Sequence, residues 1–168
     1  SGLNSVAIGY RALQSITTVN DVTAVGGSAL RLNTTGSHNT AVGTYALDAN
    51  TTGGFNTALG IQALSSNTEA YNNTGLGAKT LLANTTGDSN TAVGSQAAKA
   101  NTTGTANCAI GYQSLDANTE GNYNNAFGYG ALGNATTAGA NLALGYLSMA
   151  ATTTGGSNTA VGHLSLDA

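Results

Sequence analysis

The chain has 168 residues, of which only 7% are charged, with a net charge of −3 and neither Pro nor Trp. It has no basic footprint for nucleic acid, and no apolar run approaches the ~20 residues that span a bilayer. We therefore expect neither nucleic-acid binding nor membrane insertion by this segment, and the lone Cys108 excludes an intrachain disulfide.

A glycine recurs every seventeen residues without one insertion. These register glycines are Gly9, Gly26, Gly43, Gly60, Gly77, Gly94, Gly111, Gly128, Gly145 and Gly162. The typical unit, residues 39–55, reads N-T-A-V-G-x-x-A-L-x-x-N-T-T-G-x-x. Aliphatic residues on so strict a period argue against disorder, and frequent glycine without an i, i+3, i+4, i+7 pattern disfavours helices.

In chain order, each unit offers a strand-like segment ending at the register glycine, a second segment after it, and an Asn-Thr-Thr-Gly turn. The residue before each glycine is large and apolar, and we expect it to form a core column that includes Val42, Leu59, Leu76, Val93 and Ile110. The residue four places after each glycine predicts a second core column that includes Leu47, Leu64, Leu81 and Leu115.

One seventeen-residue unit cannot bury its own apolar face, so the units must stack. The sequence predicts an all-β fold, a parallel β-solenoid (β-roll) of ten 17-residue coils that rise ~4.8 Å each and form a rod roughly 45 to 50 Å long. Residues seventeen apart in the sequence then become neighbours in adjacent coils. At the position five residues after the register glycine, no two neighbouring coils carry charges of the same sign. A recurring asparagine, four residues before the glycine, is expected to hydrogen-bond along the rod: Asn39, Asn56, Asn73, Asn90, Asn107, Asn124, Asn141 and Asn158.

The residue two places before the register glycine is always Ala or Gly. Because strand side chains alternate, this column lies opposite the bulky one. Two interpretations stay open: the small residues line a tight turn inside their own coil, or another subunit approaches them closely. The thin core favours the second, which predicts a side-by-side homotrimer. The intersubunit candidates are Ala41, Ala58, Gly75, Ala92, Ala109 and Ala126.

The run N-S-V-A-I-G-Y-R-A-L at residues 4–13 and its echoes N-T-A-V-G and N-C-A-I-G resemble the head repeats of trimeric autotransporter adhesins. The longer unit N-T-A-L-G-I-Q-A-L-S-S-N-T at residues 56–68 is similar to repeats of phage tail-fibre proteins. The resemblance implies a left-handed parallel β-roll, three chains packed side by side, and surface attachment without catalytic residues. Adhesin-head repeats are shorter, so the extra residues here should lengthen the Asn-Thr-Thr-Gly turn.

Catalysis needs convergent ionisable groups, and His38 and His163 stand far apart with isolated acids. We therefore expect no enzyme, no metal site and no cofactor. A threonine file could present an ice-binding face, although turn capping explains its hydroxyls better: Thr34, Thr51, Thr68, Thr85, Thr102, Thr119, Thr136 and Thr153. The candidate binding residues are Tyr112, Tyr129, Tyr146 and His163, which follow consecutive register glycines and could stack on sugars or on an apolar partner, or form a simple exposed ladder.

These observations favour a structural and adhesive segment of a phage tail fibre or a bacterial trimeric surface adhesin. It would be extracellular and would attach to a host-surface glycan or protein; the alternative is a dedicated ice-binding or glycan-binding module. We expect residues 1–168 to form a single tandem-repeat domain within a longer fibre, because both termini interrupt the repeat, with residues 1–2 a candidate tag remnant.

Overall fold

Ten short parallel strands stack into one sheet that runs the length of the rod. The computed structural model describes residues 4–167. Each repeat supplies one strand: β1 (Val6–Ile8), β2 (Thr23–Val25), β3 (Thr40–Val42), β4 (Thr57–Leu59), β5 (Thr74–Leu76), β6 (Thr91–Val93), β7 (Cys108–Ile110), β8 (Asn125–Phe127), β9 (Leu142–Leu144) and β10 (Thr159–Val161). The strands follow in chain order, and every paired residue lies seventeen places from its partner, as Val42 does from Leu59.

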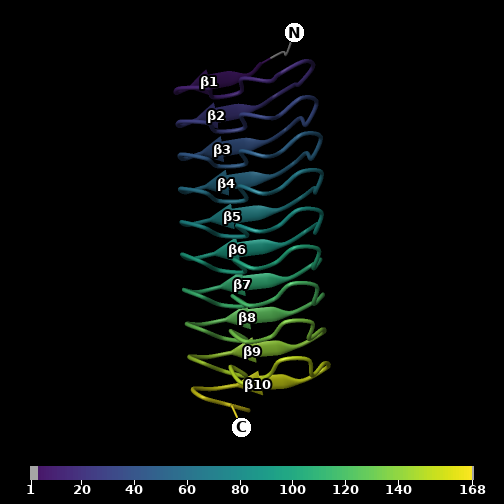
Figure 1. Cartoon of the computed structure of the whole chain (residues 1–168). Coiled ribbons are helices and arrows are strands. Elements are labelled where there is room, and N and C mark those ends of the chain that lie inside the picture. The colour runs from purple at the N-terminus through teal and green to yellow at the C-terminus, as the bar shows by residue number, and fades with distance from the viewer. Residues whose placement is uncertain (1–3, 168) are drawn as a thin grey trace.

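Figure 1 shows these strands as rungs of a rod of stacked coils, with β1 at one end and β10 at the other. The predicted all-β parallel solenoid is confirmed. Within residues 4–167 there is no helix, and hence none that could cross a membrane.

The segment that follows each register glycine is not a second strand. In it, left-handed residues alternate with residues of negative φ; Tyr45 has φ 59° and Leu47 has φ 49°. The amides of these two left-handed residues point toward opposite neighbouring coils, while the Ala46 amide between them donates to Gly43 O of its own coil at 3.2 Å. Tyr45 N donates to Gly27 O of the preceding coil at 2.9 Å, and Leu47 N donates to Ala63 O of the following coil at 3.0 Å. The segment is thus bonded along the rod as a strand would be, through a different backbone conformation.

One leucine per coil fills most of the interior. Leu47, Leu64, Leu81 and Leu115 are completely buried, which confirms this predicted core column. Burying a leucine side chain stabilises the fold by roughly 1.5–3 kcal/mol. Repeated in successive coils, this file is the main apolar contribution to the rod.

The bulky column that precedes the register glycine faces outward instead. Leu59 is 50% exposed and Ile110 39%, while Val42, Leu76 and Val93 are only partly buried. The prediction that these five residues lie in the core is therefore wrong for the single chain. Alternation along a three-residue strand places its first and third side chains on one side, and in this sheet that side is the surface.

The small column takes the inner place. Ala41, Ala58, Gly75, Ala92, Ala109 and Ala126 are all buried within their own coils. A Cβ built on Gly75 would lie 2.8 Å from Thr80 Oγ1 and 3.4 Å from Leu64 Cδ1, so this column faces the leucine file inside the coil and glycine stands where Thr80 takes the space. The opposite wall of the coil lies too close for a larger residue. The expectation that these residues meet another subunit is wrong, and the interpretation that places them inside the coil holds.

The register glycines are required where the chain leaves each strand. Gly60 has φ 136°, and a Cβ on it would lie 2.5 Å from Gly77 O of the next coil. Both the dihedral angle and the close approach exclude any other residue. This crowding explains why the glycine period has no exception.

Two files of buried asparagine satisfy the backbone at the turn. In the predicted file, Asn73 Oδ1 accepts from Asn90 N at 2.8 Å, and Asn73 Nδ2 donates to Gly87 O at 2.9 Å. A second file lies in the Asn-Thr-Thr-Gly turn, where Asn84 Nδ2 donates to Asn67 Oδ1 at 3.0 Å. Buried polar groups are stable only when paired in this way, so the expected hydrogen bonding along the rod is confirmed.

Candidate functional site

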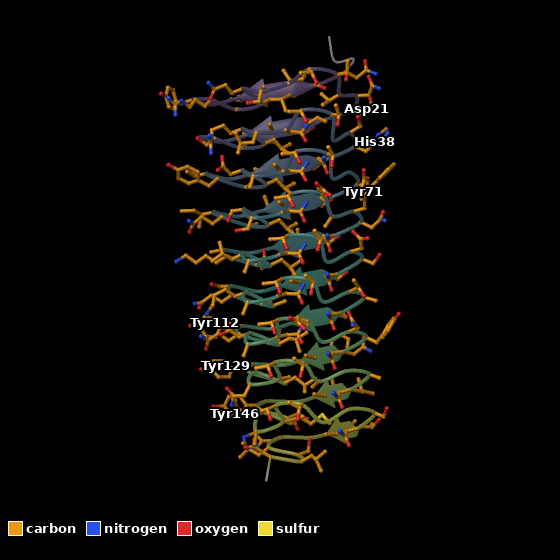
Figure 2. The ribbon with its side chains drawn as sticks, turned by 45° about the vertical axis from the view of Figure 1, so that its right-hand side comes forward. Asp21, His38, Tyr71, Tyr112, Tyr129 and Tyr146 are labelled. Carbon is orange, nitrogen blue, oxygen red and sulfur yellow. The ribbon has the colours of Figure 1, made fainter. Side chains whose placement is uncertain are left out.

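The four aromatic candidates form one continuous stack. The ring centroids of Tyr112 and Tyr129 lie 5.4 Å apart, those of Tyr129 and Tyr146 5.2 Å, and those of Tyr146 and His163 5.1 Å. Figure 2 shows the three tyrosines one below another along one edge of the rod. Each inner ring therefore uses both faces on its neighbours and presents only its edge and hydroxyl outward. The ladder interpretation is supported, and a sugar ring could not stack within this file.

A smaller aromatic group lies on the opposite edge, where Figure 2 labels Asp21, His38 and Tyr71. His38 stacks on Phe55 with centroids 4.7 Å apart, and its Nδ1 lies 3.7 Å from Asp21 Oδ2. Tyr71 Oη donates to Thr52 O at 3.0 Å. These contacts tie adjacent coils together and bring no nucleophile to a base.

The threonine file uses its hydroxyls in hydrogen bonds between adjacent coils. Thr34 Oγ1 donates to Thr51 O at 3.0 Å, and the same contact repeats along the file down to Thr136, which donates to Thr153 O at 3.3 Å. The turn-capping interpretation is confirmed. Because the hydroxyl protons are committed to carbonyl groups, this file is a poor candidate for an ice-binding face.

Opposite charges pair within the column that lies five residues after the glycine. Arg31 Nε and Nη2 donate to the Asp48 carboxylate at 2.8 and 2.9 Å, and hydrogen bonding to Asp48 raises the pKa of Arg31. Lys99 Nζ lies 3.2 Å from Asp116 Oδ2. The absence of like-charged neighbours thus reflects direct pairing between coils.

Just below the Lys99–Asp116 pair, two columns of side chains are interrupted. Gly130 and Gly133 stand where the preceding coil carries Gln113 and Asp116. The missing side chains leave a cavity of about 230 Å³, which we call the notch. Its lining consists of Gln113, Asp116, Tyr129, Gly130, Gly133, Asn134, Leu147 and Ala150.

The notch has one acidic wall. Asp116 Oδ1 is shielded from solvent and accepts no hydrogen bond, although Oδ2 is paired with Lys99. Of the predicted binding residues, only Tyr129 borders this cavity. The other lining residues were not predicted from the sequence. The available signal was the pair of glycines in columns that otherwise carry longer side chains.

The described residues give little support for a metal site or for a reactive thiol. In residues 4–167 no group of three or more His, Cys, Asp and Glu side chains could hold a metal ion. Cys108 is partly buried on the outer side of β7, and burial raises the pKa of its thiol, so its nucleophilic thiolate form is disfavoured.

Comparison of the chain with protein-family models, with curated proteins and with solved structures finds no match.

Proposed function

We propose that this chain is a rigid structural and adhesive segment of an extracellular fibre, of the kind found in phage tail fibres or bacterial trimeric surface adhesins. The observation that carries the proposal is the outer face of the sheet, which we call the sheet face: the first and third residues of β1–β10. It runs along the whole rod, and no charged residue occurs at any of its positions.

The column of third strand residues in the sheet face is apolar throughout, although the column of first residues is mostly threonine. Ile8 is 60% exposed, Leu59 50%, Leu144 46% and Val161 62%, and all four belong to the same column. A contiguous exposed apolar surface of this extent is typical of protein interfaces. Ten strands with two outward residues each supply twenty side chains, which approaches the roughly 20–30 residues that a stable interface uses per partner.

The partner that best fits this face is a second and third copy of the same rod. Identical rods share the 17-residue period, so their apolar columns can run alongside one another over the full length. Three chains around a common axis would cover the columns that a single chain leaves exposed. This arrangement restores a buried role to Val42, Leu59, Leu76, Val93 and Ile110, now between subunits.

A bundle of three such rods would be stiff and would extend far from the surface that carries it. Each coil is bonded to the next by backbone, asparagine and threonine hydrogen bonds, and the coils repeat ~4.8 Å apart. A trimer would display every surface feature three times, which increases attachment through multivalency. Host-surface glycans or proteins are the proposed partners.

Molecular mass in solution tests the assembly. We expect light scattering to give roughly three times 16.4 kDa. Leu59→Glu should yield monomers because it places a charge in the apolar face, whereas the exposed turn variant Thr52→Glu should remain trimeric. A monomeric wild-type protein at micromolar concentration would refute the proposal.

Cross-linking offers an independent check at the same face. Cys108 is the outward first residue of β7, so equivalent thiols should approach one another around the axis. A short bis-maleimide should give covalent dimers of the wild-type protein and none of Leu59→Glu.

A further inference from the structure

The notch combines a cavity with an unpaired polar group, Asp116 Oδ1. We propose that it binds a single neutral sugar ring, as one unit of a surface glycan. The proposal deepens the attachment function and rests on it for its biological setting, but the site belongs to one chain and shares no residue with the sheet face.

The size of the notch limits the ligand. A cavity of about 230 Å³ is smaller than the roughly 300–1,000 Å³ that holds a drug-sized molecule. Its depth is that of one coil, because side chains are missing at Gly130 and Gly133 but present in the coils on both sides. A single ring with its substituents fits these limits better than an extended peptide.

The lining has the mixed chemistry that a sugar requires. Asp116 supplies acceptors only, whereas the amides of Gln113 and Asn134 can both donate and accept. Neither amide makes a side-chain hydrogen bond within the described residues, so both are free to bind ring hydroxyls. Leu147 and Ala150 give an apolar wall for C–H groups, and Leu147 Cδ2 leans over the Cα of Gly130.

The acidic wall accounts for the preference for a hydroxylated ligand. Asp116 Oδ1 is a buried acceptor without a donor, which is an unfavourable state for a carboxylate oxygen. A ligand hydroxyl that reaches this oxygen would supply the missing donor, and Lys99, whose Nζ lies 3.2 Å from Oδ2, balances the charge. Since the pair is neutral overall, a neutral ring is preferred over an acidic one.

Tyr112 and Tyr146 fix the position of Tyr129 at the side of the notch. Tyr129 is held between Tyr112 and Tyr146, as Figure 2 shows, and cannot offer a ring face. Tyr129 lines the cavity, but its two ring faces are already occupied. The stack thus fixes one side of the notch, in place of the face-on stacking expected from the sequence.

Ligand-observed saturation-transfer NMR on the full chain tests the proposal. The probes are the methyl glycosides of glucose, galactose and N-acetylglucosamine, with sialic acid as the acidic comparison. We expect saturation transfer from at least one neutral glycoside, with a dissociation constant on the order of 1 mM, and at least tenfold weaker binding of sialic acid.

The decisive variant is Gly133→Lys, which fills the notch and offers Asp116 the partner that Lys99 provides above it. Its Cβ would lie 3.0 Å from Gly130 O, which offsets part of the gain from the new ion pair, so the melting temperature should stay close to that of the wild type. Sugar binding should weaken at least tenfold, and a folded variant that has lost binding excludes misfolding as the cause. Ser65→Lys introduces a lysine in the same column, next to Asp48 and far from the notch, and this variant should bind sugar like wild type.

Two outcomes would overturn the proposal: no saturation transfer from any neutral glycoside, or equal transfer in wild type and Gly133→Lys. Both are distinguishable from failure of the proposed fibre function. That failure would appear as a monomeric mass in light scattering, whereas Gly133→Lys leaves every residue of the sheet face unchanged.

Discussion

Replacing one asparagine of the predicted file should destabilise the rod far more than its polar character suggests. Asn73 is completely buried. Its Oδ1 accepts from Asn90 N at 2.8 Å and its Nδ2 donates to Gly87 O at 2.9 Å. Asn73→Ala removes both contacts and leaves the Asn90 amide without an acceptor.

The expected magnitude follows from those two contacts. An unpaired buried N–H costs about 1–3 kcal/mol, and loss of the bond to Gly87 adds about 1 kcal/mol. Gly87 O keeps its bond from Asn84 Nδ2 at 3.0 Å, which limits the second contribution. We expect the free energy of unfolding to fall by about 2–4 kcal/mol.

Urea unfolding followed by circular dichroism, at a fixed protein concentration, measures this change. The matched control is Asn134→Ala, an exposed asparagine whose replacement should alter stability by less than about 0.5 kcal/mol. Equal midpoints for Asn73→Ala and Asn134→Ala would refute the reasoning, because they would mean that the buried file contributes no net stability.

Three further predictions concern the backbone and the thiol. Gly60→Ala should prevent folding or lower the melting temperature by more than 10 °C, since its Cβ would lie 2.5 Å from Gly77 O, and a native-like melting curve would contradict this. Gln62→Gly should raise the unfolding free energy by about 0.5–1 kcal/mol, because residue 62 has φ 56°; a loss of stability in urea titration would count against it. Burial raises the pKa of Cys108, so iodoacetamide at pH 8.5 should alkylate the folded protein more slowly than the unfolded chain, and equal rates in buffer and in urea would show the opposite.

The period of the fold could be read directly from the sequence, whereas the direction of its side chains could not. Seventeen-residue spacing requires stacked coils, and Leu64 was placed correctly in the core. Both Ala58 and Leu59 recur on the same period, so repetition alone does not say which column faces inward. The overlooked clue was Thr57, which shares a side with Leu59 and indicates a surface.

The conformation of the second segment had no clear signal. Leu64 adopts φ 53°, although a left-handed backbone usually favours Gly or Asn. Here the need to aim amides along the rod and the leucine side chain into the interior outweighs the local preference. For the notch the only signal was the interruption of two columns at Gly130 and Gly133, because its lining residues come from three successive coils and meet only after stacking.

The asparagine files also determine how the rod should respond to a pull along its axis. The turn file spans only the middle coils: Ile16 stands in its place in the first coil and Ala135 in the eighth, where Asn118 Oδ1 is left without a donor. Because axial tension loads the coils in series, the weakest junction yields first. The junctions between coils joined by the turn file, from Asn33 to Asn118, should therefore hold longer than those without it, which gives the rod a graded mechanical resistance.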